Sequence, residues 1–272
     1  MSVLVFANAT LGKIKKGAFE VVAYGNKLAE QLGTEVVVLT VNAENNEELY
    51  QYGASKVVAV QQDELAAFNA NNYASVIKQV AEAEGANVVV LDSSIDGLYL
   101  APILAVQLDA AYASNVVALP SNTSPFTVKR KAFSNKAFSN TVLNTENKVI
   151  SLAKNSFGVH EIPVSGTTVS FEATVGASGV NSEKVDRVTG KVTIADAETV
   201  VSAGRGLKGP ENWGMVEELA DVLGAATACS KPVSDLGWRP HSEHVGQTGK
   251  PVASNLYIAI GISGAIQHLA GV

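Results

Sequence analysis

The sequence predicts an α/β fold in which two doubly wound parallel sheets follow one another along the chain. Three observations predict it. Short β-branched runs alternate with segments of helical spacing over the first 110 residues, a polar stretch interrupts the pattern near residue 190, and the alternation restarts at Thr199. A chain of 272 residues suits two domains of ordinary size. We expect a first domain over residues 1–185, a linker over 186–198 and a second domain over 199–272.

The first domain begins with four short apolar runs and three helical segments. The run Glu35–Val41 (EVVVLTV) is continuously apolar or β-branched, which is typical of a strand covered on both faces. Gly33 and Gly85 follow two of the helical segments as stop signals. The predicted strands are residues 2–7, 35–41, 56–60 and 87–91, and the predicted helices lie around residues 13–32, 76–81 and 100–108.

The pattern changes from Ser114, where strand-like runs are separated by turn residues. We interpret this region as a partly antiparallel extension of the same sheet. The expected strands are residues 115–119, 126–130, 141–149 and 166–173. The pentapeptide KAFSN occurs twice in succession, at 131–135 and 136–140. Five residues are too few for a repeat architecture, so the repeat indicates coincidence or a local duplication at a hairpin.

The second domain repeats the α/β pattern on a smaller scale. The predicted strands are residues 198–203, 225–229 and 256–262, and the predicted helices are 212–223 and a segment that begins at 263. Each strand runs directly into a turn rich in glycine or polar residues. In open parallel sheets, ligands bind beyond the carboxyl ends of the strands. We therefore expect a ligand-binding site at the carboxyl ends of these three strands.

Composition excludes several classes of function. The net charge of −6 and pI of about 5.3 argue against non-specific nucleic-acid binding, which needs a basic face. The single cysteine, Cys229, cannot form an internal disulfide. No apolar run approaches the ~20 residues that span a bilayer, and the N-terminus has no signal-peptide pattern. We expect a cytoplasmic protein that is not inserted in a membrane.

Four turns of the second domain could bind a ligand. They are GRG at 204–206, CSK at 229–231, VGQTG at 245–249 and GISGAIQHLAG at 261–271. Glycines let the backbone approach a ligand closely, and Arg205 offers a planar donor fork suited to phosphate. Each turn taken alone also has a structural interpretation, as a tight turn, an exposed loop or a polar hairpin. Their convergence at one sheet edge favours a binding site.

Two other groups of residues have simpler interpretations. Residues 92–97 follow a strand and either bind a nucleotide phosphate or cap the next helix through Ser94 or Asp96. His241 and His244 lie three apart in a polar loop. A zinc site needs further ligands at suitable spacing, so we expect solvent-exposed loop histidines and no metal site.

The segments LYIAIGISGAIQHLAG at 256–271, VGQTG at 245–249 and GRGL at 204–207 resemble the alpha-subunit signature of electron transfer flavoproteins, the family that includes FixB-type proteins. The match is specific over the second domain and looser over the first. It implies two Rossmann-like domains, the first resembling adenine-nucleotide hydrolases and the second binding FAD. It also implies a heterodimer with an electron transfer flavoprotein beta subunit.

The resemblance implies an electron carrier with no catalytic residues. Single electrons would pass from flavin dehydrogenases, such as acyl-CoA dehydrogenases of fatty acid beta-oxidation, to a quinone-linked oxidoreductase. Thr248 is expected near flavin N5 and His268 near the C2 carbonyl, where donors stabilise developing negative charge. The implied FAD-binding residues are Arg205, Ser230, Lys231, Val245, Gly246, Gln247, Thr248, Ser263, Gly264, Ala265, Ile266, Gln267 and His268.

The sequence departs from the family pattern in two ways. The family usually has Arg at the position of Lys231, so we expect a changed flavin potential with binding retained. Family members also continue beyond the position of Gly271, whereas this sequence ends at Val272. We therefore expect weak or absent FAD in the isolated chain. The alternatives are an adenine-nucleotide-binding module, or a chain that docks a beta subunit without holding flavin.

Overall fold

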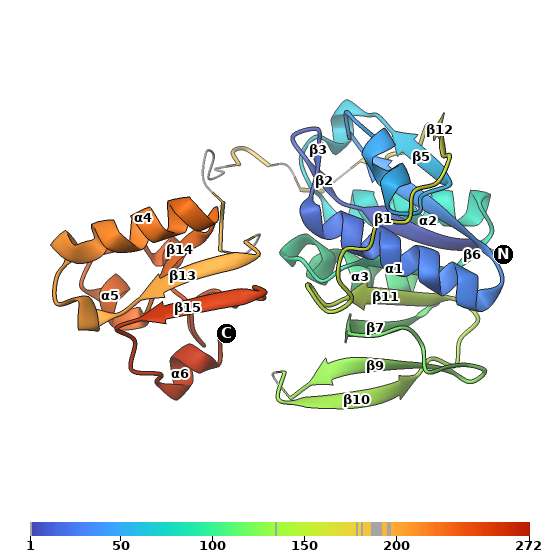
Figure 1. Cartoon of the computed structure of the whole chain (residues 1–272). Coiled ribbons are helices and arrows are strands. Elements are labelled where there is room, and N and C mark those ends of the chain that lie inside the picture. Colours follow the sequence, from blue (N-terminus) through green and yellow to red (C-terminus); the bar gives the residue numbers. More distant parts are fainter. Residues whose placement is uncertain (1, 134, 178, 181, 186–191, 195–196) are drawn as a thin grey trace. The chain divides into compact units, whose positions relative to one another are not determined.

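The computed structural model describes residues 2–272 except 134, 178, 181, 186–191 and 195–196. The chain divides into two compact units, Met1–Glu183 and Lys184–Val272 (Figure 1). Each unit has its own sheet, mostly parallel in the first and fully parallel in the second, and its own hydrophobic core. The predicted α/β fold is confirmed.

The first unit is built on a ten-stranded sheet with the order β10-β9-β7-β11-β6-β1-β4-β5-β12, and β8 pairs with β9. Most neighbours are parallel, and only the pairs that involve β9 are antiparallel. The strands are β1 (Ser2–Ala7), β4 (Glu35–Val41), β5 (Lys56–Val60), β6 (Ala86–Asp92), β7 (Ala111–Val116), β8 (Asn122–Thr123), β9 (Phe126–Ala132), β10 (Ala137–Val142), β11 (Lys148–Leu152) and β12 (Thr167–Ser170).

Helices cover both faces of this sheet, which explains why its central strands are continuously apolar. Val3 and Val5 of β1 pack in one core cluster with α1 (Lys16–Leu32). Leu4 and Phe6 pack in a second cluster with α2 (Ala70–Ala83) and α3 (Ile95–Gln107). Alternate residues of a strand point to opposite faces, so both sets must be apolar when both faces are covered.

Several predicted boundaries in this unit were wrong for identifiable reasons. The helix predicted from residue 13 begins at Lys16, because two-residue strands β2 (Ala9–Thr10) and β3 (Lys13–Ile14) form a small hairpin first. The run predicted as one strand at 141–149 is divided between β10 and β11. β11 then enters the sheet in parallel between β6 and β7, so the antiparallel extension is confined to β8, β9 and β10.

The two KAFSN copies fall on the two sides of the β9–β10 hairpin. Ala132 of the first copy pairs with Ala137 of the second, across the turn. The repeat therefore marks a hairpin, as one interpretation of the sequence proposed. One of its residues, Ser134, lies outside the described residues.

The second unit has a three-stranded parallel sheet with β13 in the centre, in the order β14-β13-β15. Its strands are β13 (Thr199–Ala203), β14 (Ala226–Cys229) and β15 (Leu256–Ile260), and its helices are α4 (Gly214–Leu223), α5 (Lys231–Asp235) and α6 (Ile266–Leu269). β15 ends two residues earlier than predicted, because Gly261 turns the backbone away at φ +61°. The short helix α6 begins only at Ile266, after an irregular Ser263-Gly264-Ala265 segment in which Gly264 has φ +69°.

The predicted linker, residues 186–198, lies mostly outside the described residues. Two of its described members, Ile194 and Ala197, are buried in a core cluster with Val200 and Val245. These two side chains pack into the second unit.

Candidate functional site

The turns that follow β13 and β15 touch through their backbones. Gly206 N donates to the carbonyl oxygen of Gly261 at 3.0 Å. A Cβ atom at Gly204 would lie 2.3 Å from that same oxygen, and one at Gly206 would lie 2.6 Å from Gly261 Cα. Neither approach leaves room for a side chain. The glycines of the GRG turn are therefore required by packing alone, whatever they bind.

The VGQTG turn lies against the end of the chain. Gln247 N donates to Gln267 O at 2.7 Å. A Cβ at Gly271 would lie 2.5 Å from Gly246 N, so these two segments are also in close backbone contact. Val245 N donates to Cys229 O at 3.0 Å, which ties the turn to the end of β14. The structure thus brings together all four turns that the sequence singled out.

The predicted site residues divide into an exposed and a buried set. The exposed set is Arg205, Lys231, Gln247, Thr248, Ser263, Gly264, Ala265, Ile266 and Gln267. The buried set is Ser230, Val245, Gly246 and His268. The Val245 side chain is fully buried in the core, so only its backbone is available to a ligand. Among the described residues, the N–H groups of Ser263, Gly264 and Ala265 have no hydrogen-bond acceptor.

His268 is turned into the unit. Its side chain is 7% exposed, and Nε2 lies 2.8 Å from the Tyr257 hydroxyl. Nδ1 is buried without a hydrogen-bond partner in the described part of the chain. Burial lowers the pKa of His268 below its ordinary value, so the ring is neutral at pH 7. Nδ1 is thus a buried polar atom without a hydrogen bond of good geometry among the described residues, although the Val245 backbone lies close enough to act against the lowering of the ring's pKa.

Arg239 organises the segment that leads into the VGQTG turn. Its guanidinium donates to both carboxylate oxygens of Glu243, at 2.7 and 2.8 Å, and to Glu217 of α4 at 2.8 Å. It also lies over the Trp213 ring, 5.4 Å from the centroid. Sequence reasoning missed this network. The available signal was Glu243 four residues after Arg239, a spacing that pairs charges on one side of a helical turn.

The expectation for His244 was wrong. His241 is exposed, and its Nδ1 lies 2.8 Å from Ser234 Oγ, but His244 is only 5% exposed. His244 is buried because its backbone forms an isolated parallel β-bridge with Cys229, the last residue of β14. Burial lowers its pKa. In the described part of the chain no three His, Cys, Asp or Glu side chains gather as a metal site would require.

The candidate phosphate turn of the first unit is a helix cap. Ser94 Oγ accepts from Gly97 N at 3.2 Å, so Ser94 is the N-cap of α3. Asp92 Oδ1 accepts from both the N–H and the hydroxyl of Ser94. Asp96 pairs with Lys15 at 3.3 Å instead of capping. Two carboxyl groups at this helix start disfavour a bound phosphate.

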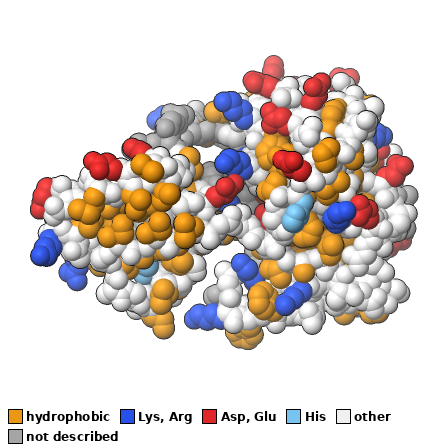
Figure 2. Space-filling model, in the orientation of Figure 1, with side chains coloured by type: hydrophobic (Ala, Val, Ile, Leu, Met, Phe, Trp, Pro, Cys, Tyr) orange, Lys and Arg blue, Asp and Glu red, His pale blue; other side chains and the backbone are white. Residues whose placement is uncertain are grey.

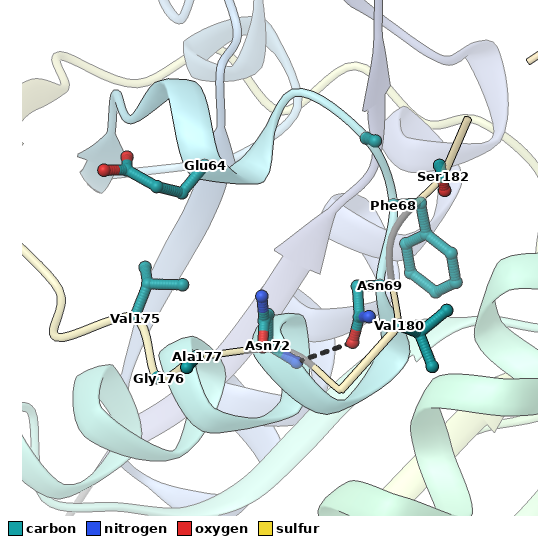
Figure 3. A pocket seen from close by; sticks show the side chains of 10 residues that line it. Glu64, Phe68, Asn69, Asn72, Val175, Gly176, Ala177, Val180 and Ser182 are labelled. Carbon is teal, nitrogen blue, oxygen red and sulfur yellow. Dashed lines mark hydrogen bonds between the residues drawn. The ribbon is translucent and has the colours of Figure 1, made fainter. Parts of the chain in front are cut away.

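The first unit also has a groove of about 470 Å³ beside the start of α2 (Figure 3). Its polar side chains include Asn69, which caps α2 by accepting from the Asn72 N–H at 3.2 Å. Glu64 is its one charged side chain among the residues that line it, and none of them is basic. The residues that line the groove therefore supply amide and hydroxyl donors but no cation for a nucleotide phosphate.

Residues 193–272 match the family profile described as the electron transfer flavoprotein FAD-binding domain, and residues 3–185 match the one described as the electron transfer flavoprotein domain. The chain belongs to the electron transfer flavoprotein alpha-subunit family. The FAD-binding match contains all four turns of the candidate site. The candidate site therefore lies within the residues that match the family's FAD-binding domain.

Similar proteins agree with this assignment. The chain is 32% identical over 270 residues to the electron transfer flavoprotein subunit alpha of Syntrophomonas wolfei, covering 98% of this chain and 85% of that one. It is 30% identical to the Bacillus subtilis subunit, covering 99% and 84%. It is 35% identical over 256 residues to the probable mitochondrial subunit of Caenorhabditis elegans, covering 89% and 74%. Among the described helices of this flavoprotein subunit, none combines the length and the apolar character needed to cross a membrane.

Proposed function

We propose that this chain is the alpha subunit of a heterodimeric electron transfer flavoprotein. It would carry single electrons from flavin dehydrogenases, such as acyl-CoA dehydrogenases, to a quinone-linked oxidoreductase. The observation that supports the proposal most is the meeting of four donor-rich turns at the carboxyl ends of β13, β14 and β15, within the residues that match the FAD-binding domain. FAD, when bound, supplies the one-electron chemistry.

The donor set at this edge of the sheet fits FAD. Arg205 and Lys231 provide exposed positive charge for a pyrophosphate, and the unpaired N–H groups of residues 263–265 are further donors. The exposed Gln247 and Thr248 side chains can donate to a flavin ring. The buried residues Val245 and Gly246 would position this turn through their backbone and not through side-chain contacts.

His268 would act as a hydrogen-bond donor toward the flavin. Its ring has one nitrogen engaged with Tyr257 and one without a partner. A neutral imidazole carries one N–H proton. If one ring nitrogen accepts a hydrogen bond, the proton must be on the other nitrogen, which is then the donor. If the Tyr257 hydroxyl donates to Nε2, the proton is held at Nδ1, which is buried near the Val245 backbone, so a contact with the flavin would require this region to open.

The proposed role needs no catalytic acid or base, because the chain would transfer electrons and convert no substrate. Binding, orientation and fixed donors are sufficient for such a carrier. We also propose that an electron transfer flavoprotein beta subunit completes the assembly, which the family of the relatives supports. The alternative of a nucleotide site in the first unit is disfavoured by the carboxylates at the start of α3.

A flavin titration tests the proposal. The chain is co-purified with an electron transfer flavoprotein beta subunit, stripped of flavin, and titrated with FAD while flavin fluorescence is recorded. We expect saturable quenching, and an affinity about tenfold weaker for Arg205→Ala because a charge-assisted phosphate contact is lost. Lys27→Ala, in an exposed pair on α1, is the matched control. Absence of FAD binding, or equal losses in both variants, contradicts the proposal.

A further inference from the structure

The β9–β10 hairpin of the first unit has an unusual charge. Its 17 residues, Phe126–Val142, contain Lys129, Arg130, Lys131 and Lys136 and no Asp or Glu. The absence of acidic residues extends over residues 110–145, whereas the whole chain has 26 acidic against 20 basic residues. The hairpin is therefore a basic feature on an acidic protein.

None of these four cations forms an ion pair with a described residue. Other lysines of the first unit do so, for example Lys56 with Glu84 at 2.7 Å. Arg130 is held by neutral groups, the hydroxyls of Thr141 and Ser114. The positive charge of the hairpin is thus not neutralised within the described part of the chain.

One face of the hairpin combines this charge with exposed apolar side chains. The register pairs Lys131 with Phe138 and Lys129 with Asn140, so these four side chains lie on the same face. Phe138 is 60% exposed and lies under the ammonium of Lys129, 4.5 Å from its ring centroid. Phe133 at the turn is 84% exposed. Figure 2 shows basic side chains beside hydrophobic ones over this hairpin.

The outer edge of β10 is also open. Within the described residues, β10 pairs with β9 alone and forms one end of the sheet (Figure 1). Proteins usually protect an edge strand with proline or with charges on the strand itself. β10 has neither in its sequence AFSNTV. An unprotected edge of six residues is a template for an added strand.

We infer that the β9–β10 hairpin is a docking surface for an extended acidic segment of a partner protein. The segment would pair with the free edge of β10, and its carboxylates would face Lys129 and Lys131. A second copy of this chain fits poorly, because two such hairpins edge to edge would bring like charges together. The small, charged surface suits a transient contact. This inference does not depend on the proposed function, since it concerns neither flavin nor the second unit.

Peptide binding to the full chain tests the inference. The probe is a fluorescein-labelled peptide of alternating Glu and Val, followed by fluorescence anisotropy. We expect saturable binding that weakens steeply with salt, and an affinity lower by about tenfold or more for the double variant K129E/K131E. The control K13E/K78E makes the same change of charge elsewhere on the first unit and should bind normally. A peptide of alternating Lys and Val should not bind.

A second measurement keeps the test decisive if a variant folds poorly. Hydrogen exchange of the wild-type chain should slow at the β10 amides when the acidic peptide is added, and circular dichroism should show that each variant is folded. The inference is overturned if the acidic peptide does not bind, if K129E/K131E binds as tightly as the control, or if β10 is not protected. Binding of single-stranded DNA or anionic vesicles in place of the peptide overturns it as well.

Discussion

The Tyr257 hydroxyl lies 2.8 Å from His268 Nε2 and joins the strand β15 to the short helix α6. Tyr257 is partly buried, and burial raises its pKa to about 12, so the hydroxyl keeps its proton at physiological pH. His268 is buried and neutral. The pair therefore helps to hold α6, and with it the segment of residues 263–265, through a hydrogen bond between two neutral groups.

The stability of the second unit should fall as the pH is lowered through 6.5. Burial lowers the pKa of His268 and of His244 below 6.5, so the unfolded state binds more protons than the folded state as the pH falls. Their contribution to stability is complete above pH 6.5 and is lost below it. The measurement is urea denaturation at pH 7.5 and 5.5, followed by tryptophan fluorescence. Both tryptophans, Trp213 and Trp238, are in this unit.

Two variants test whether His268 contributes to this pH dependence of stability. His268→Gln should reduce the loss of stability between the two pH values, because one of the two buried titrating rings is removed. His160→Gln is the control, since His160 is exposed and lies in the first unit. Equal stability of the wild-type chain at the two pH values would show that the buried histidines do not behave as described.

Replacing Arg239 should destabilise the second unit. Arg239→Ala removes three charge-assisted hydrogen bonds and leaves Glu217 and Glu243 without their partner, at an expected cost of about 2 kcal/mol. Arg239→Lys should recover part of this loss, because lysine keeps the charge but not the planar fork. Denaturation monitored by tryptophan fluorescence measures both. Lys27→Ala, which breaks only an exposed pair, should change stability by less than about 0.5 kcal/mol.

The GRG turn should tolerate no side chain at Gly206. Gly206→Ala places a methyl group 2.6 Å from Gly261 Cα, and the overpacking should cost about 1–3 kcal/mol. Flavin binding by the heterodimer should weaken in parallel. Gly214→Ala, at the first residue of α4, meets no atom within 4 Å and is the matched control. Comparable destabilisation by both variants would mean that the close approach of the two turns does not constrain this position.

Lys231→Arg should shift the flavin reduction potentials without abolishing binding. Lys231 is exposed at the start of α5, where arginine would keep the positive charge but add a planar donor fork. The measurement is a redox titration of the heterodimer with bound FAD. Lys208→Arg provides the same exchange at another exposed position near the GRG turn and should leave the potentials unchanged. Identical potentials for wild type and Lys231→Arg would contradict the prediction.

The strands could be predicted because burial dictates their composition. Glu35–Val41 and Lys56–Val60 occur in the structure with the predicted bounds. A strand that is covered on both faces must be apolar along most of its length, and such a run is easily recognised in a sequence. The start of α1 could not be predicted, because the β2–β3 hairpin before it depends on a two-residue pairing with no hydrophobic pattern. The place of β11 inside the sheet also depends on long-range pairing.

The candidate site could be predicted to the level of its turns but not of its side chains. Glycine and polar residues after each strand identify the four turns, because parallel strands deliver them to one edge. The burial of His244 and His268 depends on contacts with Cys229 and Tyr257, which no local spacing reveals. The contact between Arg239 and Glu217 joins residues 22 positions apart, so it could not be predicted from local spacing either.

The flavin spectrum of the purified heterodimer shows whether this chain holds FAD together with its partner. The chain is produced together with an electron transfer flavoprotein beta subunit, isolated as a complex, and examined by visible absorbance against the chain produced alone. We expect a flavin spectrum with one FAD per heterodimer, and little or none in the chain alone. A stable heterodimer that contains no FAD and acquires none when FAD is added would contradict it.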